Sequence, residues 1–139
     1  MLRSSQDRFF PGRETLVPSF RLATDQGGEK GTADLRQKRS GVLLFLPDPA
    51  NRSGLAVLEA FGRYAEEIEG LEAAAWAIVQ ADAETARSLR QKLDLPFAIL
   101  LDPEKKTAAK CLDPSERNGS VVLVIDRFGS VWDRIPVRG

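Results

Sequence analysis

Thiol and imidazole side chains are scarce in this chain of 139 residues, which has one cysteine, Cys111, and no histidine. A thiolate is the nucleophile in thiol-dependent redox catalysis, so Cys111 is the one thiol that could perform it. However, Cys111 lies near the C-terminal end of a predicted helix, where the helix dipole disfavours a thiolate. We interpret Cys111 as a small buried hydrophobic residue, with a redox role as the alternative.

A second candidate site is the polar segment at the expected start of the first long helix. This segment comprises Asn51, Arg52, Ser53 and Gly54, and it follows Pro47 at the end of an apolar run. Free backbone amides at a helix start attract anions, and Arg52 and the Ser53 hydroxyl could add to that attraction. We therefore predict that Pro47 and these four residues bind a small anionic ligand. The alternative is an ordinary helix cap at Ser53 beside a solvated arginine.

Composition disfavours several other functions. Twenty basic residues balance twenty acidic ones, so no net field draws the chain to nucleic acid or to an anionic membrane, and we expect neither as a partner. Without histidine or clustered cysteines, we expect no metal and no cofactor. One cysteine cannot form an internal disulfide, and charges at Arg3, Asp7 and Arg8 interrupt the N-terminal stretch. These features predict a cytoplasmic protein.

The elements that must position these candidates alternate between predicted strands and helices. Apolar runs predict strands over residues 41–46, 74–80 and 96–101, and the stretches 120–126 and 130–135 predict a terminal hairpin. Helical spacing and caps predict helices over 53–70, 82–93 and 102–112. An N-terminal hairpin has its arms near 18–22 and 31–35. We predict one α/β domain over 1–139, with 41–46 central in the sheet and 1–14 a loosely ordered segment.

Three of these stretches resemble motifs of one family. Residues 17–22 are similar to an A-P-x-F-x-L opening, 95–103 to L-P-F-x-L-L-x-D, and 124–129 to F-x-I-D-x-x-G. In this order they resemble the peroxiredoxins, the alkyl hydroperoxide reductase/thiol-specific antioxidant branch of the thioredoxin-like superfamily. The resemblance spans residues 12 to 135. It implies a thioredoxin-like fold, in which a central mixed β-sheet is flanked by helices and preceded by an N-terminal β-hairpin.

The resemblance also implies which catalytic groups are replaced. The family's catalytic loop reads P-x-x-x-T-x-x-C, and only its proline matches, as Pro47. Asn51 stands at the threonine position, Gly54 at the position of the peroxidatic cysteine, and Ser120 at that of a distant arginine. In thioredoxin, the positions of Asn51 and Gly54 would hold the two cysteines of a C-x-x-C pair. Both redox mechanisms thus lose their nucleophile.

We therefore predict a degenerate peroxiredoxin-like protein that is a non-catalytic binding or interaction module. Its partner is an unknown protein or a small anionic ligand. The alternative is an antioxidant thiol oxidoreductase or peroxidase acting through Cys111. The resemblance implies a further helix after the final hairpin, and we expect this C-terminal helix to be absent, because the chain stops at Gly139 soon after that hairpin. An apolar patch left bare there predicts a homodimer.

Overall fold

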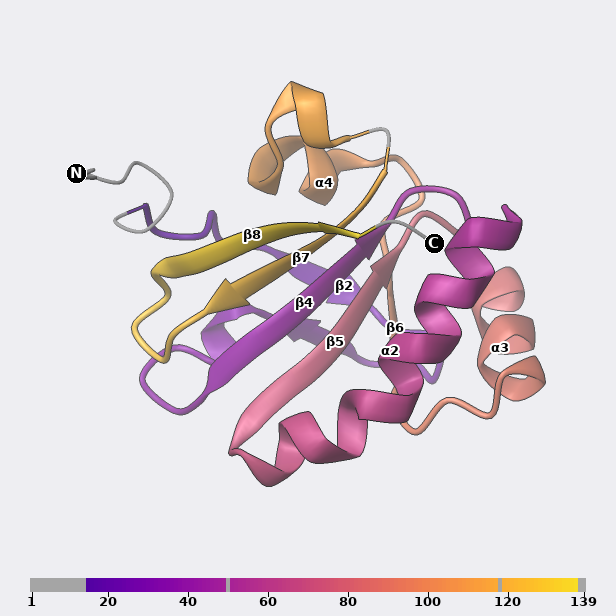
Figure 1. Ribbon diagram of the computed structural model, residues 1–139, viewed down its shortest axis with the longest axis horizontal. Helices are drawn as coiled ribbons and strands as arrows, with labels where there is room; N and C mark the ends of the chain where they lie inside the picture. The colour runs from indigo at the N-terminus through magenta and orange to yellow at the C-terminus, as the bar shows by residue number, and fades with distance from the viewer. Residues whose placement is uncertain (1–14, 50, 118, 138–139) are drawn as a thin grey trace.

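The computed structural model describes residues 15–49, 51–117 and 119–137. Five strands form one mixed sheet in the order β6-β5-β4-β7-β8, shown in Figure 1. Their bounds are Ser40–Leu46 for β4, Ala73–Val79 for β5, Ile99–Leu101 for β6, Ser120–Ile125 for β7 and Val131–Val137 for β8. The segment 1–14, which we predicted to be loosely ordered, lies outside the described residues.

Strand β4 is the centre of the sheet, which confirms the prediction from its continuous apolar run. It pairs in parallel with β5 and antiparallel with β7. Alternate residues of a strand point to opposite faces, and here neighbouring residues such as Leu43 and Leu44 are both fully buried. A strand that is apolar on both faces is stable only between two covering layers, and both layers are present.

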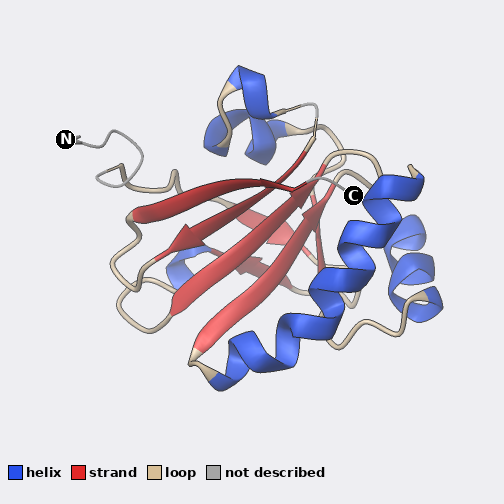
Figure 2. Cartoon of the chain, viewed as in Figure 1, coloured by secondary structure: helices blue, strands red, loops and turns tan. Residues whose placement is uncertain are grey.

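One layer consists of two helices on one face of the sheet. Helix α2 (Arg52–Gly70) packs on β4 and β5, and α3 (Ala83–Lys92) lies beside β6. Their apolar residues join Leu44 and Leu46 of β4 in one cluster. Figure 2 shows both helices on the same side of the red sheet.

The opposite face is covered by shorter elements, an N-terminal hairpin and a short helix between β6 and β7. The N-terminal hairpin pairs β2 (Arg21–Ala23) with β3 (Glu29–Gly31), and the short helix α4 (Lys106–Cys111) lies over the other end of the sheet. Leu43 and Phe45 of β4 belong to the cluster on this face, together with Cys111 and Leu112. The expected hairpin, mixed sheet and flanking helices are thus confirmed.

Several predicted boundaries were wrong. Helix α4 begins at Lys106, not at Asp102, although Asp102 does cap it: its two carboxylate oxygens accept from the Thr107 amide (3.1 Å) and the Ala108 amide (2.9 Å). The second hairpin arm ends at Gly31, and a 3-10 helix (Thr32–Asp34) follows it. The first error arises because Asp102 caps α4 from four residues before the helix begins, and the second because the Asp34 carboxylate accepts from the Gly31 amide at 2.8 Å, which starts the 3-10 helix directly after the strand.

No helix covers β7 and β8 on the α2 side within the described residues. We define the open sheet face as Val42, Val122, Val124 and Ile135, which the strand register places on the face of the sheet that α2 covers. Ile135 is 43% exposed, and Tyr64 on the adjacent flank of α2 is 59% exposed. Beside them lies an apolar hollow of about 240 Å³ between α2 and strands β7 and β8. The bare patch expected from the sequence is therefore present.

Candidate functional site

The loop from β4 to α2 is where the sequence predicts the functional site. Helix α2 is capped by Asn51, whose side-chain oxygen accepts a hydrogen bond from the Ser53 amide at 2.8 Å. The Asn51 amide in turn donates to the Asp48 carbonyl at 3.3 Å. The prediction of Ser53 as the cap was wrong by two residues, because an asparagine side chain is equally suited to this role and stands at the required non-helical position.

The loop and the start of β7 enclose a hollow of about 250 Å³. Four of the five predicted ligand-binding residues line it, namely Pro47, Asn51, Ser53 and Gly54, and Ser120 lies with them. Arg52 is exposed and is not among the lining residues. The structure therefore brings together the positions that the family resemblance linked across the sheet, whereas the binding of an anion there stays a prediction.

Gly54 is the most constrained position of this loop. It is buried, and a Cβ atom built on its backbone would lie 2.5 Å from the Asp48 carbonyl oxygen and 3.4 Å from the Leu46 Cδ1 atom. Because the nearer atom belongs to the backbone, a larger residue fits only if the loop moves. The loop thus closes tightly over the position at which the family resemblance puts the reactive thiol.

Cys111, the alternative redox candidate, is the last residue of α4 and is 5% exposed. It belongs to the hydrophobic cluster on the face of the sheet opposite α2. Burial raises the pKa of the thiol to about 11, although the positive charges of Lys110 and Arg134 act in the opposite direction. The thiol is therefore protonated at neutral pH, as expected of the structural role that we predicted from its place at a helix C-terminus.

An ion pair fixes the segment that follows Cys111. The Arg134 guanidinium of β8 donates to the Cys111 carbonyl at 2.6 Å and to the Glu116 carboxylate at 2.9 Å. This hydrogen bond holds the pKa of the Glu116 carboxyl below its usual value. Glu116 also accepts from the Asp113 amide at 2.8 Å, so one carboxylate connects the sheet to the turn after α4.

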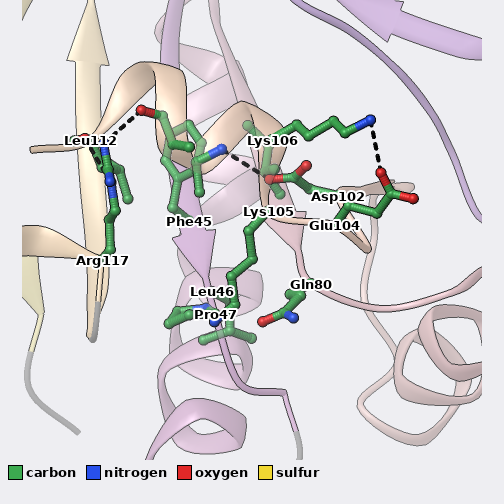
Figure 3. A pocket seen from close by; sticks show the side chains of 13 residues that line it. Phe45, Leu46, Pro47, Gln80, Asp102, Glu104, Lys105, Lys106, Leu112 and Arg117 are labelled. Atoms are coloured by element: carbon green, nitrogen blue, oxygen red, sulfur yellow. Dashed lines mark hydrogen bonds and ion pairs between the residues drawn. The ribbon is translucent and has the colours of Figure 1, made fainter. Parts of the chain in front are cut away.

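A second hollow, of about 310 Å³, was missed by the sequence analysis. It opens at the carboxyl ends of β4 and β5 and is roofed by α4 (Figure 3). Its lining combines buried apolar side chains with charged residues from the loop and turn that flank α4: Phe45, Leu46, Pro47, Ile78, Gln80, Asp102, Glu104, Lys105, Lys106, Ala108, Ala109, Leu112 and Arg117. The only sequence signal was the run of charges at 104–106 directly after a buried strand.

Comparison with known families identifies the scaffold. Residues 14–131 match the AhpC/TSA family. The chain belongs to that family. The matched range includes the β4–α2 loop. This loop contains no cysteine, since Cys111 is the single cysteine of the chain. Among curated proteins, no sequence matches.

Solved structures support the same fold. Peroxidoxin BcpB from Mycobacterium tuberculosis is 18% identical, with a TM-score of 0.76 over 90% of this chain and 85% of that one. A cysteine-to-serine mutant of PrxQ from Xylella fastidiosa is 11% identical, with a TM-score of 0.74 over 88% and 86%. A putative thiol:disulfide interchange protein DsbE from Chlorobium tepidum is 16% identical, with a TM-score of 0.74 over 91% and 85%. The thioredoxin-like fold is thus shown by both kinds of comparison.

None of the helices in the described part of the chain is both long and apolar enough to cross a membrane. In the same residues, no three histidine, cysteine, aspartate or glutamate side chains are grouped so as to hold a metal ion.

Proposed function

We propose that this AhpC/TSA-family chain is a degenerate redoxin, a non-catalytic binding or interaction module that has kept the fold without thiol peroxidase chemistry. The observation that carries the proposal is the absence of a thiol from the β4–α2 loop together with the tight closure of that loop over Gly54. A peroxidase of this family type needs a thiolate at the helix start, where amides and the dipole lower its pKa. Neither the atom nor the space for it is present at Gly54.

The properties of Cys111 support the same proposal. A reactive thiol is exposed and has a lowered pKa, whereas this thiol is buried and has a pKa raised to about 11. Peroxide oxidises the thiolate, so Cys111 is a poor substitute for the missing nucleophile. A lone protonated thiol also fits the reducing cytoplasm in which we place the protein.

The first test is catalytic. Purified protein, with a metal chelator present, is incubated with hydrogen peroxide and dithiothreitol, and peroxide loss is followed over time. We expect the same loss as in buffer with dithiothreitol alone. Faster loss that persists in the presence of the chelator would contradict the proposal, and its disappearance in Cys111→Ser would identify a peroxidase acting through Cys111.

As the ligand of the β4–α2 hollow we propose a small anion such as inorganic phosphate. The dipole of α2, a helix of 19 residues, points its positive end at the hollow. Phosphate titration followed by amide resonances should move those of Ser53 and Gly54 in a saturable way, and Arg52→Gln should weaken the binding. Resonances of Ser53 and Gly54 that do not move would exclude the predicted site, and a response unchanged by Arg52→Gln would show that Arg52 is not part of it.

As the interaction partner we propose a second copy of this chain, seated on the open sheet face. Contiguous apolar patches that reach the surface are uncommon on a monomer, and here the exposed Ile135 and the half-buried Val42, Val122 and Val124 lie on one face beside the exposed Tyr64. Burying the same face on two subunits around a twofold axis removes both patches from water in one step.

A further inference from the structure

The hollow beneath α4 has properties of its own and lies on the other side of Pro47 from the β4–α2 hollow. Pro47 lines both, but only the hollow beneath α4 reaches β5 and α4. From the lining we infer that it is a binding site for a short amphiphilic anion, of the class of medium-chain carboxylates. This inference does not depend on whether the chain is catalytic.

The floor of the hollow is apolar. Phe45 and Leu46 at the end of β4 and Ile78 of β5 are buried, and Leu112 closes the far side. The volume of about 310 Å³ equals roughly ten water molecules at about 30 Å³ each, enough for a chain of about eight carbons. Hollows of this size with apolar walls and a few polar groups are typical of sites for small organic ligands.

The charged side chains around the opening comprise two carboxylates, Asp102 and Glu104, and three cations. The Asp102 carboxylate is buried and accepts from the two α4 amides already described. On the rim, the Glu104 carboxylate lies 2.9 Å from the Lys106 ammonium. These amide bonds hold the Asp102 carboxylate in place but do not neutralise it, so the lining has three cations and two carboxylates and carries one excess positive charge.

Two of the three cations have no carboxylate partner among the described residues. The Arg117 guanidinium donates to the carbonyls of Leu112 (3.2 Å) and Ala109 (2.8 Å), which hold it in place but do not neutralise it. Lys105, at a left-handed φ of 61°, forms no ion pair with any described carboxylate. Figure 3 shows Arg117 at one end of the hollow and the Lys106–Glu104 pair at the other, with Lys105 between them.

An anion with an apolar tail complements this arrangement. Its tail would cover Phe45 and Leu112, and its carboxylate would reach Lys105 or Arg117 at the opening. A neutral apolar ligand would leave the excess positive charge of the lining without a counter-charge, and a small inorganic anion would leave the apolar floor in water. A medium-chain carboxylate carries both the apolar tail and the negative charge in one molecule.

The test is a titration of the full chain with sodium octanoate, followed by amide resonances, with octanol as the uncharged analogue. We expect saturable shifts of residues in and around α4, with a dissociation constant in the millimolar range or below, and weaker binding of octanol. Lys105→Asn removes one charge and keeps a residue that tolerates the left-handed conformation. It should weaken octanoate up to about fivefold, the range expected of an exposed ion pair, and should leave octanol unchanged.

Two further variants complete the design. Ala109→Leu adds bulk at an exposed position on the rim, so it should fold normally and weaken both ligands. Lys92→Gln, at the end of α3 on the opposite face, is the matched charge control and should change nothing. Three outcomes would each overturn the inference: shifts confined to the open sheet face, octanol binding as tightly as octanoate, or equal effects of Lys105→Asn and Lys92→Gln.

Discussion

Substitution of Gly54 by alanine tests the geometry on which the proposed loss of function depends. An added Cβ atom would lie 2.5 Å from the Asp48 carbonyl oxygen, well inside the ordinary contact distance of about 3.4 Å or more. The Asp48 carbonyl and the backbone at Gly54 must therefore move apart by close to an ångström, since the obstructing atom cannot rotate away. Overpacking of this kind typically costs about 1–3 kcal/mol.

The opposing effect is the helix propensity of alanine. Gly54 lies in the first turn of α2, and alanine is favoured over glycine in a helix interior by about 1 kcal/mol. The two contributions leave a net loss of about 0–2 kcal/mol for Gly54→Ala. Gly70, the last residue of the same helix, is the matched control, because an added Cβ meets no atom within 4 Å. Gly70→Ala should gain about 0.4–1 kcal/mol.

The assay is equilibrium unfolding in urea, followed by tryptophan fluorescence and by circular dichroism to establish that the transition is two-state. We expect Gly54→Ala to unfold at a lower urea concentration than wild type, and Gly70→Ala at the same or a higher one. If Gly54→Ala is at least as stable as Gly70→Ala, the loop accommodates a side chain at position 54. The loop would then not be closed over the family's thiol position.

Three further predictions concern other parts of the molecule. Because burial raises the pKa of Cys111 from 9.0 to about 11, the folded protein should hold roughly 100-fold less thiolate at pH 7 than the unfolded chain. A maleimide should therefore label the native protein far more slowly than the urea-unfolded one, and equal rates would contradict the buried position. Arg134 lowers the pKa of Glu116 in the folded state, so the stability that this carboxylate contributes is present above its unfolded pKa of about 4.5 and is lost as the pH falls through the folded pKa. The free energy of unfolding of Glu116→Gln should therefore change less between pH 5 and pH 3 than that of wild type. Identical pH profiles would show that the ion pair contributes nothing to stability. Sedimentation equilibrium should give a dimer that Ile135→Lys dissociates and Leu71→Lys does not, since Leu71 is 81% exposed but lies outside the open sheet face; a wild-type monomer would exclude the second copy as partner.

The sequence was sufficient for the fold because its strongest signals are long. The apolar run that became β4 has no polar residue on either face, which marks a central strand, and the cap at Asp82 lies beside its helix and bonds the Thr85 amide at 2.8 Å. Short elements were placed less well. Asp102 caps α4 from four residues before the helix begins, a distance that no local cap pattern contains.

For the β4–α2 loop, too, the sequence predicted the location but not the detailed geometry. The β4–α2 loop could be located from the family motif, and Ser120 could be assigned to it, because both depend on sequence order. The closeness of the Asp48 carbonyl to Gly54 could not be foreseen, since it depends on the backbone path of the loop. The hollow beneath α4 was missed because its walls come from the ends of β4 and β5, the loop after β6 and a short helix, and no motif in these segments marks a ligand site.

The central claim is that no thiol of this chain reacts with peroxide as a family nucleophile would. The most direct measurement is a single-turnover titration: fully reduced protein, freed of reductant, is mixed with an equal amount of hydrogen peroxide, and the remaining peroxide and the intact protein mass are followed together. We predict that peroxide is consumed no faster than by the Cys111→Ser variant and that the protein mass stays unchanged over the time course. Rapid consumption of one equivalent, with the mass increase of one oxygen atom on Cys111, would contradict the claim and make this chain a one-cysteine peroxidase.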